Sequence, residues 1–168
     1  VTGCYPQVEP EAFLKMKGVG YLLGNREKNQ IPDLLPLMQK GKSPRVQVGD
    51  IQEDTLFSEI PLRSFHRHTR AFLKIQDGCN ARCSYCIVPY ARGRSRSLSS
   101  ERVIEDLKFL KEKGFKEVVL TGIHLGAYGL DLPLPFPFEK LLKQLEKEET
   151  PPRIRLSSIE PGDFSPEL

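Results

Sequence analysis

The chain of 168 residues is long enough for one ordinary domain or for parts of two, and its 39% of apolar residues can supply a normal core. No stretch approaches the roughly 18 consecutive apolar residues that span a bilayer, and the opening residues Val1-Thr2-Gly3 are unlike a secretory signal. We therefore expect a cytoplasmic protein with no membrane partner. Because it lacks an initial Met and ends on what resembles the start of a helix, we also expect a fragment.

The net charge of +3 is unevenly distributed. Residues 61–97 contain eight Lys or Arg against the single acid Asp77, a net +7, which leaves −4 for the rest of the chain. Four aromatic residues are interleaved with this block: Phe65, Phe72, Tyr85 and Tyr90. This combination suits a polyanionic partner such as RNA. The alternative is a solvated basic face beside a cofactor.

The first part of the chain predicts the last β-α unit of an α/β layer. Residues 19–23 form a short apolar run that leads into the turn Gly24-Asn25, which predicts a buried strand. Residues 28–39 predict a helix interrupted by prolines at positions 32 and 36. Residues 40–69 have no clear periodicity and predict a linker, with one short extended piece around residues 46–51.

The rest of the chain alternates strand and helix patterns. The predicted elements are a strand at 71–75, a helix that Ser99 or Ser100 caps and that ends at Gly114, a strand at 118–120, a helix at 138–145 and a strand at 153–157. Short connections between them favour parallel βαβ units, so the expected fold class is α/β. The chain stops too early to close an eight-fold barrel.

Three cysteines, Cys79, Cys83 and Cys86, follow the strand at 71–75 in the order C-x3-C-x2-C. Loops after parallel strands carry catalytic groups in such folds, and thiolates this close can converge on one metal centre. Structural zinc requires four ligands, and no fourth Cys or His lies at ordinary finger spacing. A disulfide would leave one thiol unpaired. On an iron-sulfur cluster, three cysteines leave one iron open to a cofactor or substrate.

The spacing, with Tyr85 just before the last cysteine, resembles the signature of the radical S-adenosylmethionine (SAM) superfamily. The surrounding run from Gly78 to Gly93 resembles the methylthiotransferase family, in which G-C-N-x-x-C-x-Y-C-x-x-P-x-x-R-G is characteristic. Residues 2–7, Thr-Gly-Cys-Tyr-Pro-Gln, resemble the third cysteine motif of the family's amino-terminal domain.

Residues 120–131, Leu-Thr-Gly-Ile-His-Leu-Gly-Ala-Tyr-Gly-Leu-Asp, resemble the family's second-strand motif. They are closest to the MtaB-type branch, which acts on N6-threonylcarbamoyladenosine in tRNA. The branch that acts on isopentenyladenosine usually has Gln-Asn where this chain has Ile123-His124.

The resemblance implies the end of an amino-terminal α/β methylthiotransferase domain, followed by the first βα units of a partial, truncated radical SAM (βα) barrel. The implied boundaries are 1–39 for the first domain, 40–69 for a linker and 70–168 for the radical SAM core. The rest of the barrel and the RNA-binding TRAM domain of this family are not in the chain. We therefore do not expect this piece alone to be a competent enzyme.

By the same resemblance, Cys79, Cys83 and Cys86 are catalytic and hold the radical SAM 4Fe-4S cluster. The open iron of that cluster binds SAM, whose cleavage gives a 5′-deoxyadenosyl radical that abstracts hydrogen from the target adenine. Cys4 is implied to be the third ligand of an auxiliary 4Fe-4S cluster, whose other two ligands would precede Val1. Without its context, Cys4 would be read as a small buried hydrophobe.

Other residues are assigned to SAM on the same ground. Tyr85 would lie near the adenine, with a core aromatic as the alternative. Thr121 and Gly122 end a strand and would meet the methionine part, although Gly122 could simply permit a tight turn. Three residues follow the last strand and would reach the ribose or the amino group, with helix capping as the alternative for the serines: Ser157, Ser158 and Glu160.

Two sets of basic residues remain. Arg92, Arg94 and Arg96 follow the cysteines and would contact SAM or tRNA phosphate, because guanidinium forks suit phosphate; an exposed set without a partner is the alternative. The three histidines are expected to be polar surface or hydrogen-bonding residues rather than metal ligands: His66, His68 and His124.

The predicted function is therefore that of an enzyme, a radical SAM tRNA methylthiotransferase. It would convert N6-threonylcarbamoyladenosine beside the anticodon into its 2-methylthio derivative, with tRNA, SAM, an electron donor and a sulfur source as partners. One alternative is methylthiolation of another modified tRNA adenosine or of an aspartate on a ribosomal protein. Another is a non-catalytic zinc-bound nucleic-acid module in which the same cysteines serve structure.

Overall fold

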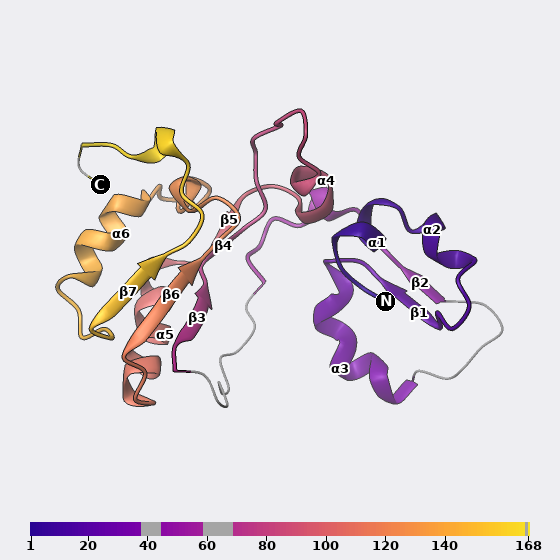
Figure 1. Cartoon of the computed structure of the whole chain (residues 1–168), viewed down its shortest axis with the longest axis horizontal. Coiled ribbons are helices and arrows are strands. Elements are labelled where there is room, and N and C mark those ends of the chain that lie inside the picture. Colours follow the sequence, from indigo (N-terminus) through magenta and orange to yellow (C-terminus); the bar gives the residue numbers. More distant parts are fainter. Residues whose placement is uncertain (38–44, 59–68, 167) are drawn as a thin grey trace. The chain divides into compact units, whose positions relative to one another are not determined.

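The structure is a computed structural model that describes residues 1–37, 45–58, 69–166 and 168. The chain forms two compact units (Figure 1). The first comprises residues 1–55 and 80–94, and the second comprises residues 56–79 and 95–168. The cysteine-rich loop is thus divided, because Cys79 belongs to the second unit while Cys83 and Cys86 belong to the first.

A three-stranded parallel sheet in the order β3-β6-β7 forms the second unit (Figure 1). In its register, Leu73 lies opposite Leu120, which lies opposite Leu156. The strands and the helices that connect them have these bounds: β3 Ala71–Lys74, α5 Ser100–Glu112, β6 Glu117–Thr121, α6 Phe138–Leu145 and β7 Arg153–Leu156. The predicted α/β class and its parallel βαβ order are confirmed.

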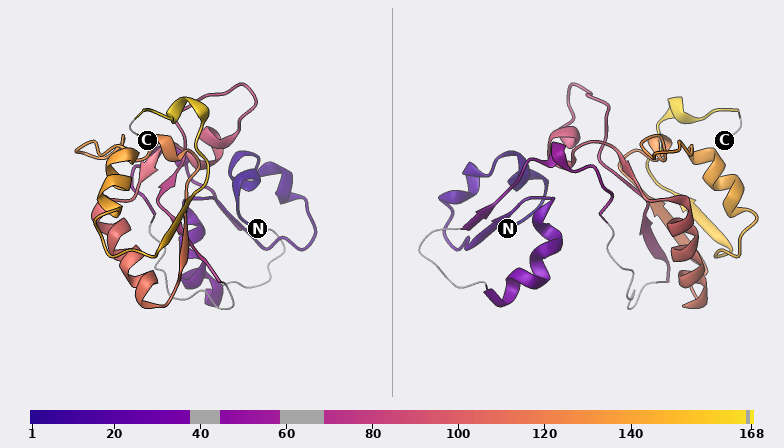
Figure 2. Two further views of the ribbon diagram at one scale, coloured as in Figure 1. Left: turned by 60° about the vertical axis from the view of Figure 1, so that its left-hand side comes forward. Right: turned by 180° about the vertical axis from the view of Figure 1, so that it is seen from behind.

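The hydrophobic core lies between one face of this sheet and the two helices, which cover the same side (Figure 2). Alternate strand residues such as Leu73 and Leu120 point into it and are buried. In α5 the buried residues recur at helical spacing: Val103, Ile104, Leu107 and Leu110. α6 contributes Leu141 and Leu145. The second unit therefore has two layers, a sheet and a pair of helices, with the core between them.

The predicted ends of these helices are confirmed. Ser99 caps α5, since its side chain accepts a hydrogen bond from Arg102 N at 3.3 Å. The chain leaves α5 through Gly114, at a φ of 88°. Two further strands, β4 (Gln76–Asp77) and β5 (Arg96–Ser97), pair antiparallel and were not predicted.

The other face of the sheet carries an ion cluster around Glu117. The guanidinium groups of Arg153, Arg155 and Arg70 lie 3.2, 3.4 and 3.5 Å from its carboxylate oxygens. The hydrogen bond from Arg153, followed by that from Arg155, lowers the pKa of Glu117 against the opposing effect of burial. The cluster links the amino-terminal ends of β6 and β7.

Changing Glu117→Gln should lower the melting temperature at neutral pH. A depressed pKa means that the carboxylate stabilises the fold above the pKa of the unfolded chain, and that this contribution is lost as the pH falls through the folded-state pKa. The difference from the unchanged protein should therefore vanish in acid, which circular dichroism melts at neutral and acid pH can check. Glu105→Gln removes one exposed pair with Arg102 and should change little. A pH-independent difference would contradict the cluster's role.

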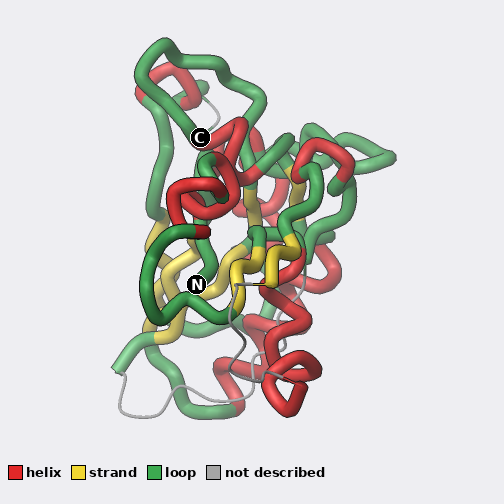
Figure 3. Tube along the Cα trace, turned by 90° about the vertical axis from the view of Figure 1, so that its right-hand side faces the viewer, coloured by secondary structure: helices red, strands yellow, loops and turns green. Residues whose placement is uncertain are grey.

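The first unit is built around a two-stranded parallel pair, β1 (Tyr21–Leu23) with β2 (Arg45–Gln47). The predicted strand at 19–23 is confirmed as β1, and the extended piece predicted around 46–51 corresponds to β2. The remaining elements are short: α1 Cys4–Val8, α2 Glu11–Leu14, η1 Glu27–Gln30, α3 Ile31–Leu34, η2 Leu35–Leu37, η3 Ile51–Glu53 and α4 Val88–Arg92. Figure 3 colours the helices, strands and loops along the chain.

The helix predicted over 28–39 is broken into η1, α3 and η2 in its described part. Prolines at 32 and 36 explain this, since each lacks the N–H that a continuous helix requires. Residues 38 and 39, and much of the predicted linker 40–69 with His66 and His68, lie outside the described residues. The domain boundaries stay a prediction. Among the described residues, no helix combines the length and apolar character needed to cross a membrane.

Candidate functional site

The strand pair β4-β5 forms the base of the cysteine loop. Gln76 lies opposite Ser97, and Asp77 lies opposite Arg96. The turn from β4 into Cys79 is fixed by Asp77, which accepts a hydrogen bond from Gly78 N at 2.9 Å and an ion pair from Lys74 Nζ at 2.9 Å. The first cysteine therefore follows a rigidly held turn.

The motif at 120–131 holds the other side of this base. Asp131 accepts two hydrogen bonds from Ser97, one from its N–H at 2.8 Å and one from its hydroxyl at 2.6 Å. The buried Tyr128 hydroxyl donates to Leu98 O at 2.7 Å, and Gly129 N donates to Ser97 Oγ at 2.8 Å. Burial raises the pKa of Tyr128 well above its ordinary value, so the phenol stays a donor.

Changing Asp131→Ala should therefore destabilise the second unit by about 1–3 kcal/mol, because the N–H of Ser97 loses its acceptor. Urea denaturation at equilibrium measures the effect. Leu130→Ala is the matched control, since its side chain is 60% exposed and its loss should cost little. Equal midpoints for the two variants would contradict the anchoring role of Asp131.

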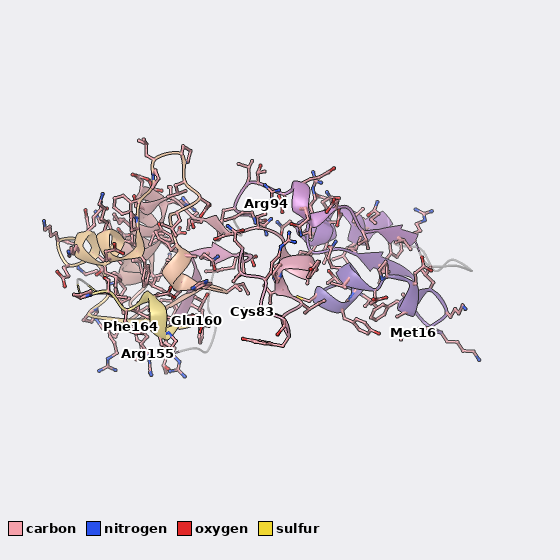
Figure 4. All side chains as sticks on the ribbon, turned by 90° about the horizontal axis from the view of Figure 1, so that it is seen from above. Met16, Cys83, Arg94, Arg155, Glu160 and Phe164 are labelled. Atoms are coloured by element: carbon pink, nitrogen blue, oxygen red, sulfur yellow. The ribbon has the colours of Figure 1, made fainter. Side chains whose placement is uncertain are left out.

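The three cysteines of the loop are free thiols. Cys79 and Cys86 are half-buried, and Cys83, which Figure 4 labels, is exposed. Cys86 N donates to Cys83 O at 3.0 Å, so these two residues share one turn. Across residues 1–37, 45–58, 69–166 and 168, no three His, Cys, Asp or Glu side chains are grouped closely enough to hold a metal ion.

The donor set nevertheless fits an iron-sulfur cluster. Three unpaired thiols lie within eight consecutive residues, and the chain between them spans at most about 3.5 Å per residue. Thiolates are the ligands that such clusters take.

The residues assigned to SAM in the second unit gather at one edge of the sheet. Parallel pairing places the ends of β3, β6 and β7 together. Thr121 ends β6, and its carbonyl accepts a hydrogen bond from Ile75 N at 2.9 Å. Ser157 and Ser158 follow β7 with exposed side chains, and Ser158 O accepts from Leu125 N at 2.9 Å.

The helix-capping alternative for these serines is wrong. The next helical turn, η5 (Pro161–Asp163), begins after Glu160, which forms a capping box with Asp163. Figure 4 labels Glu160 beyond the end of β7. The core-aromatic alternative for Tyr85 is also wrong, because that side chain is 89% exposed.

Cys4 opens α1, and its surroundings in the first unit are polar. Arg92 Nε lies 3.1 Å from Cys4 Sγ, and Asn25 Nδ2 lies 3.8 Å from it. Asn25 also donates to Ala91 O at 2.6 Å, which ties α1 to α4. Cys4 is half-buried rather than a buried hydrophobe, so the reading of it as a small core residue is wrong.

The three arginines after the loop differ in their surroundings. Arg92 faces Cys4, Arg94 is exposed, and Arg96 is 5% exposed in β5. The alternative that all three arginines are exposed is therefore wrong, because only Arg94 among them is exposed. His124 Nε2 lies 2.7 Å from Asp163 Oδ2, in keeping with its expected hydrogen-bonding role.

Two residues that support the site, Gln76 and Asp131, were not predicted. Asp131 is the last residue of the quoted motif 120–131, whereas Gln76 lies two residues before the quoted run that begins at Gly78. The sequence does indicate Gln76, because it is a polar residue directly after an apolar strand and two residues before Gly78. Its side chain is fully buried, and a buried amide requires partners.

Comparison with known proteins places the chain in a family. The model of the Radical SAM superfamily matches residues 73–167, more than half of the chain, so the chain belongs to the radical SAM superfamily. It is 38% identical over its whole length to "Threonylcarbamoyladenosine tRNA methylthiotransferase MtaB" of Bacillus subtilis (strain 168), covering 37% of that protein. The MtaB protein of Aquifex aeolicus (strain VF5) is 38% identical over 99% of the chain, which covers 40% of it.

A relative whose name gives a different substrate has the same identity to the chain. The "tRNA-2-methylthio-N(6)-dimethylallyladenosine synthase" of Moorella thermoacetica is 38% identical over the whole chain, which covers 38% of it. The chain thus spans about two fifths of the curated relatives it matches. The predicted resemblance to the radical SAM methylthiotransferases is confirmed.

Proposed function

We propose that the protein takes part in radical SAM methylthiolation of N6-threonylcarbamoyladenosine beside the anticodon of tRNA. The supporting observation is the identity of 38% along the whole chain to the MtaB protein of Bacillus subtilis. In this reaction the hydrogen on carbon 2 of the adenine is replaced by a methylthio group. The methyl group comes from SAM, and the sulfur comes from a source outside this chain.

In this proposal Cys79, Cys83 and Cys86 hold the radical SAM 4Fe-4S cluster as three free thiols. When bound, that cluster supplies the electron that cleaves SAM. The loop has to close around it, since the three thiols are not grouped in the described structure.

The chain's other residues bind and orient SAM at the carboxyl-terminal edge of the sheet. Thr121 and Gly122 line the end of β6. Beyond β7, three exposed residues are proposed to bind the ribose and the amino group: Ser157, Ser158 and Glu160. The exposed ring of Tyr85 is free to cover the adenine.

Cys4 is proposed as one ligand of an auxiliary 4Fe-4S cluster. Arg92 Nε and Asn25 Nδ2 are donors beside its sulfur and would stabilise a thiolate there. We also propose that residues 1–39 belong to the methylthiotransferase domain and residues 70–168 to the radical SAM core, joined by the linker 40–69. A cytoplasmic location and an external electron donor complete the proposal.

Methylthiolation of a dimethylallyl-type adenosine is the second candidate, because the Moorella thermoacetica relative is equally similar. Deleting the gene that encodes this chain distinguishes the two. Mass spectrometry of tRNA nucleosides should show that 2-methylthio-N6-threonylcarbamoyladenosine disappears while its precursor without the methylthio group accumulates. Loss of the methylthiolated dimethylallyl-type adenosine instead would support the second candidate. Loss of neither would reject both.

A further inference from the structure

We propose that Gln76 is a positioning residue that locks the start of the cysteine loop onto the SAM-binding edge of the sheet. Its side chain is 0% exposed and lies in β4, three residues before Cys79. This inference rests on the proposed function, because that function assigns the cysteine loop to cluster binding and the edge of the sheet to SAM binding.

The amide oxygen of Gln76 binds the loop after β6. It accepts hydrogen bonds from Ile123 N at 2.8 Å and from His124 N at 2.9 Å. These two N–H groups directly follow Thr121 and Gly122, the residues assigned to the methionine part of SAM. The oxygen therefore fixes the backbone that forms this part of the edge.

The amide nitrogen of Gln76 binds the two ends of the cysteine loop. It donates to Gly78 O at 2.8 Å, to Ser95 Oγ at 3.0 Å and more weakly to Asp77 O at 3.2 Å. Gly78 immediately precedes Cys79, and Ser95 lies where the loop returns to the second unit. One side chain thus holds both ends of the loop and the loop after β6.

Only an amide can make this set of contacts. A glutamate would keep the two acceptor bonds but would turn a second oxygen toward the carbonyls of Asp77 and Gly78. A leucine of similar size would leave buried N–H and C=O groups without partners, which is costly. The orientation of the amide is fixed too, because exchanging its oxygen and nitrogen would place NH₂ against two N–H donors.

Gly122 provides the space that Gln76 occupies. A Cβ added at Gly122 would lie 3.0 Å from both Cβ and Oε1 of Gln76, and 2.8 Å from Leu125 Cδ2. Both 3.0 Å contacts are tighter than ordinary packing, so an alanine there would push against the Gln76 side chain. A side chain at position 122 would therefore disturb the Gln76 contacts, in addition to any contact with SAM.

The test uses Gln76→Leu, Gln76→Glu and Gly122→Ala, with Val103→Ala in the buried face of α5 as a control for general destabilisation. In the chain without iron, amide hydrogen exchange at Ile123 and His124 should be at least about tenfold faster in Gln76→Leu than in the control. Gly122→Ala should accelerate exchange in the unchanged background and less in a Gln76→Ala background, where the contact with Oε1 is gone while those with Cβ and Leu125 Cδ2 remain. Equal exchange in Gln76→Leu and the control would overturn the proposal.

The second measurement follows anaerobic reconstitution with iron and sulfide. Gln76→Leu and Gln76→Glu should weaken SAM binding at least about tenfold and diminish the SAM-induced change in the electron paramagnetic resonance spectrum, while Val103→Ala keeps both. Unchanged SAM affinity in both Gln76 variants would also overturn the proposal. If the unchanged protein takes up no iron, the proposed function fails, and the exchange rates alone decide whether Gln76 locks the loop.

Discussion

Replacing Cys79, Cys83 or Cys86 with alanine is expected to reduce the iron bound after reconstitution from about four atoms per chain to a residual level. Each cysteine supplies one of the three protein ligands, and two thiolates leave the cluster with too few protein ligands to be retained. The brown colour and the SAM-dependent paramagnetic signal should disappear with the iron. Iron quantification and electron paramagnetic resonance of the reduced sample measure both.

Cys4→Ala is the matched control for this experiment. It removes the remaining cysteine, which lies beside Arg92 rather than in the loop, and it should leave iron and signal near the level of the unchanged protein. Iron uptake that survives loss of a loop cysteine would contradict the assigned ligands. Retention of zinc with no iron in folded protein would favour the nucleic-acid module instead.

Gly129→Ala is expected to cause a large loss of stability. Gly129 has a φ of 76°, which alanine adopts only with strain, and an added Cβ would overlap the carbonyl oxygen of Phe136. The backbone cannot turn aside as a flexible side chain would. Together the two effects should cost roughly 2–5 kcal/mol, measured by urea denaturation followed by circular dichroism.

Gly114→Ala separates the two contributions. Gly114 has a similar φ of 88°, but an added Cβ there would meet nothing within 4 Å. Only the backbone strain applies, so the expected loss is about 1–2 kcal/mol. If both substitutions cost the same, the contact with Phe136 does not constrain the loop and the steric part of the argument is wrong.

The periodic elements of the second unit could be predicted because local sequence determines them. Val103, Ile104, Leu107 and Leu110 follow the helical repeat and recur in α5 as its buried face. The helix at 138–145 has the predicted bounds. Such patterns depend on a single amphipathic face, which a window of a dozen residues already contains.

The supporting contacts of the site could not be predicted in the same way. The strands β4 and β5 have two residues each, which is too short for an alternating pattern to be recognised in the sequence. Gln76 meets Ile123 and His124 across a separation of 47 and 48 residues, and no local pattern encodes such a contact. The cysteine spacing was readable because its ligands lie within one short segment.

The order of the two units along the chain has a consequence for synthesis on the ribosome. The first unit includes residues 80–94, where Pro89 O accepts a hydrogen bond from Gln52 and Ala91 O accepts one from Asn25. Those partners are translated long before α4 exists. The amino-terminal unit therefore cannot complete its own contacts as it emerges, and must wait until the first strand of the next unit has been made. A nascent chain stopped before residue 80 should remain more open to proteases than one stopped after residue 94.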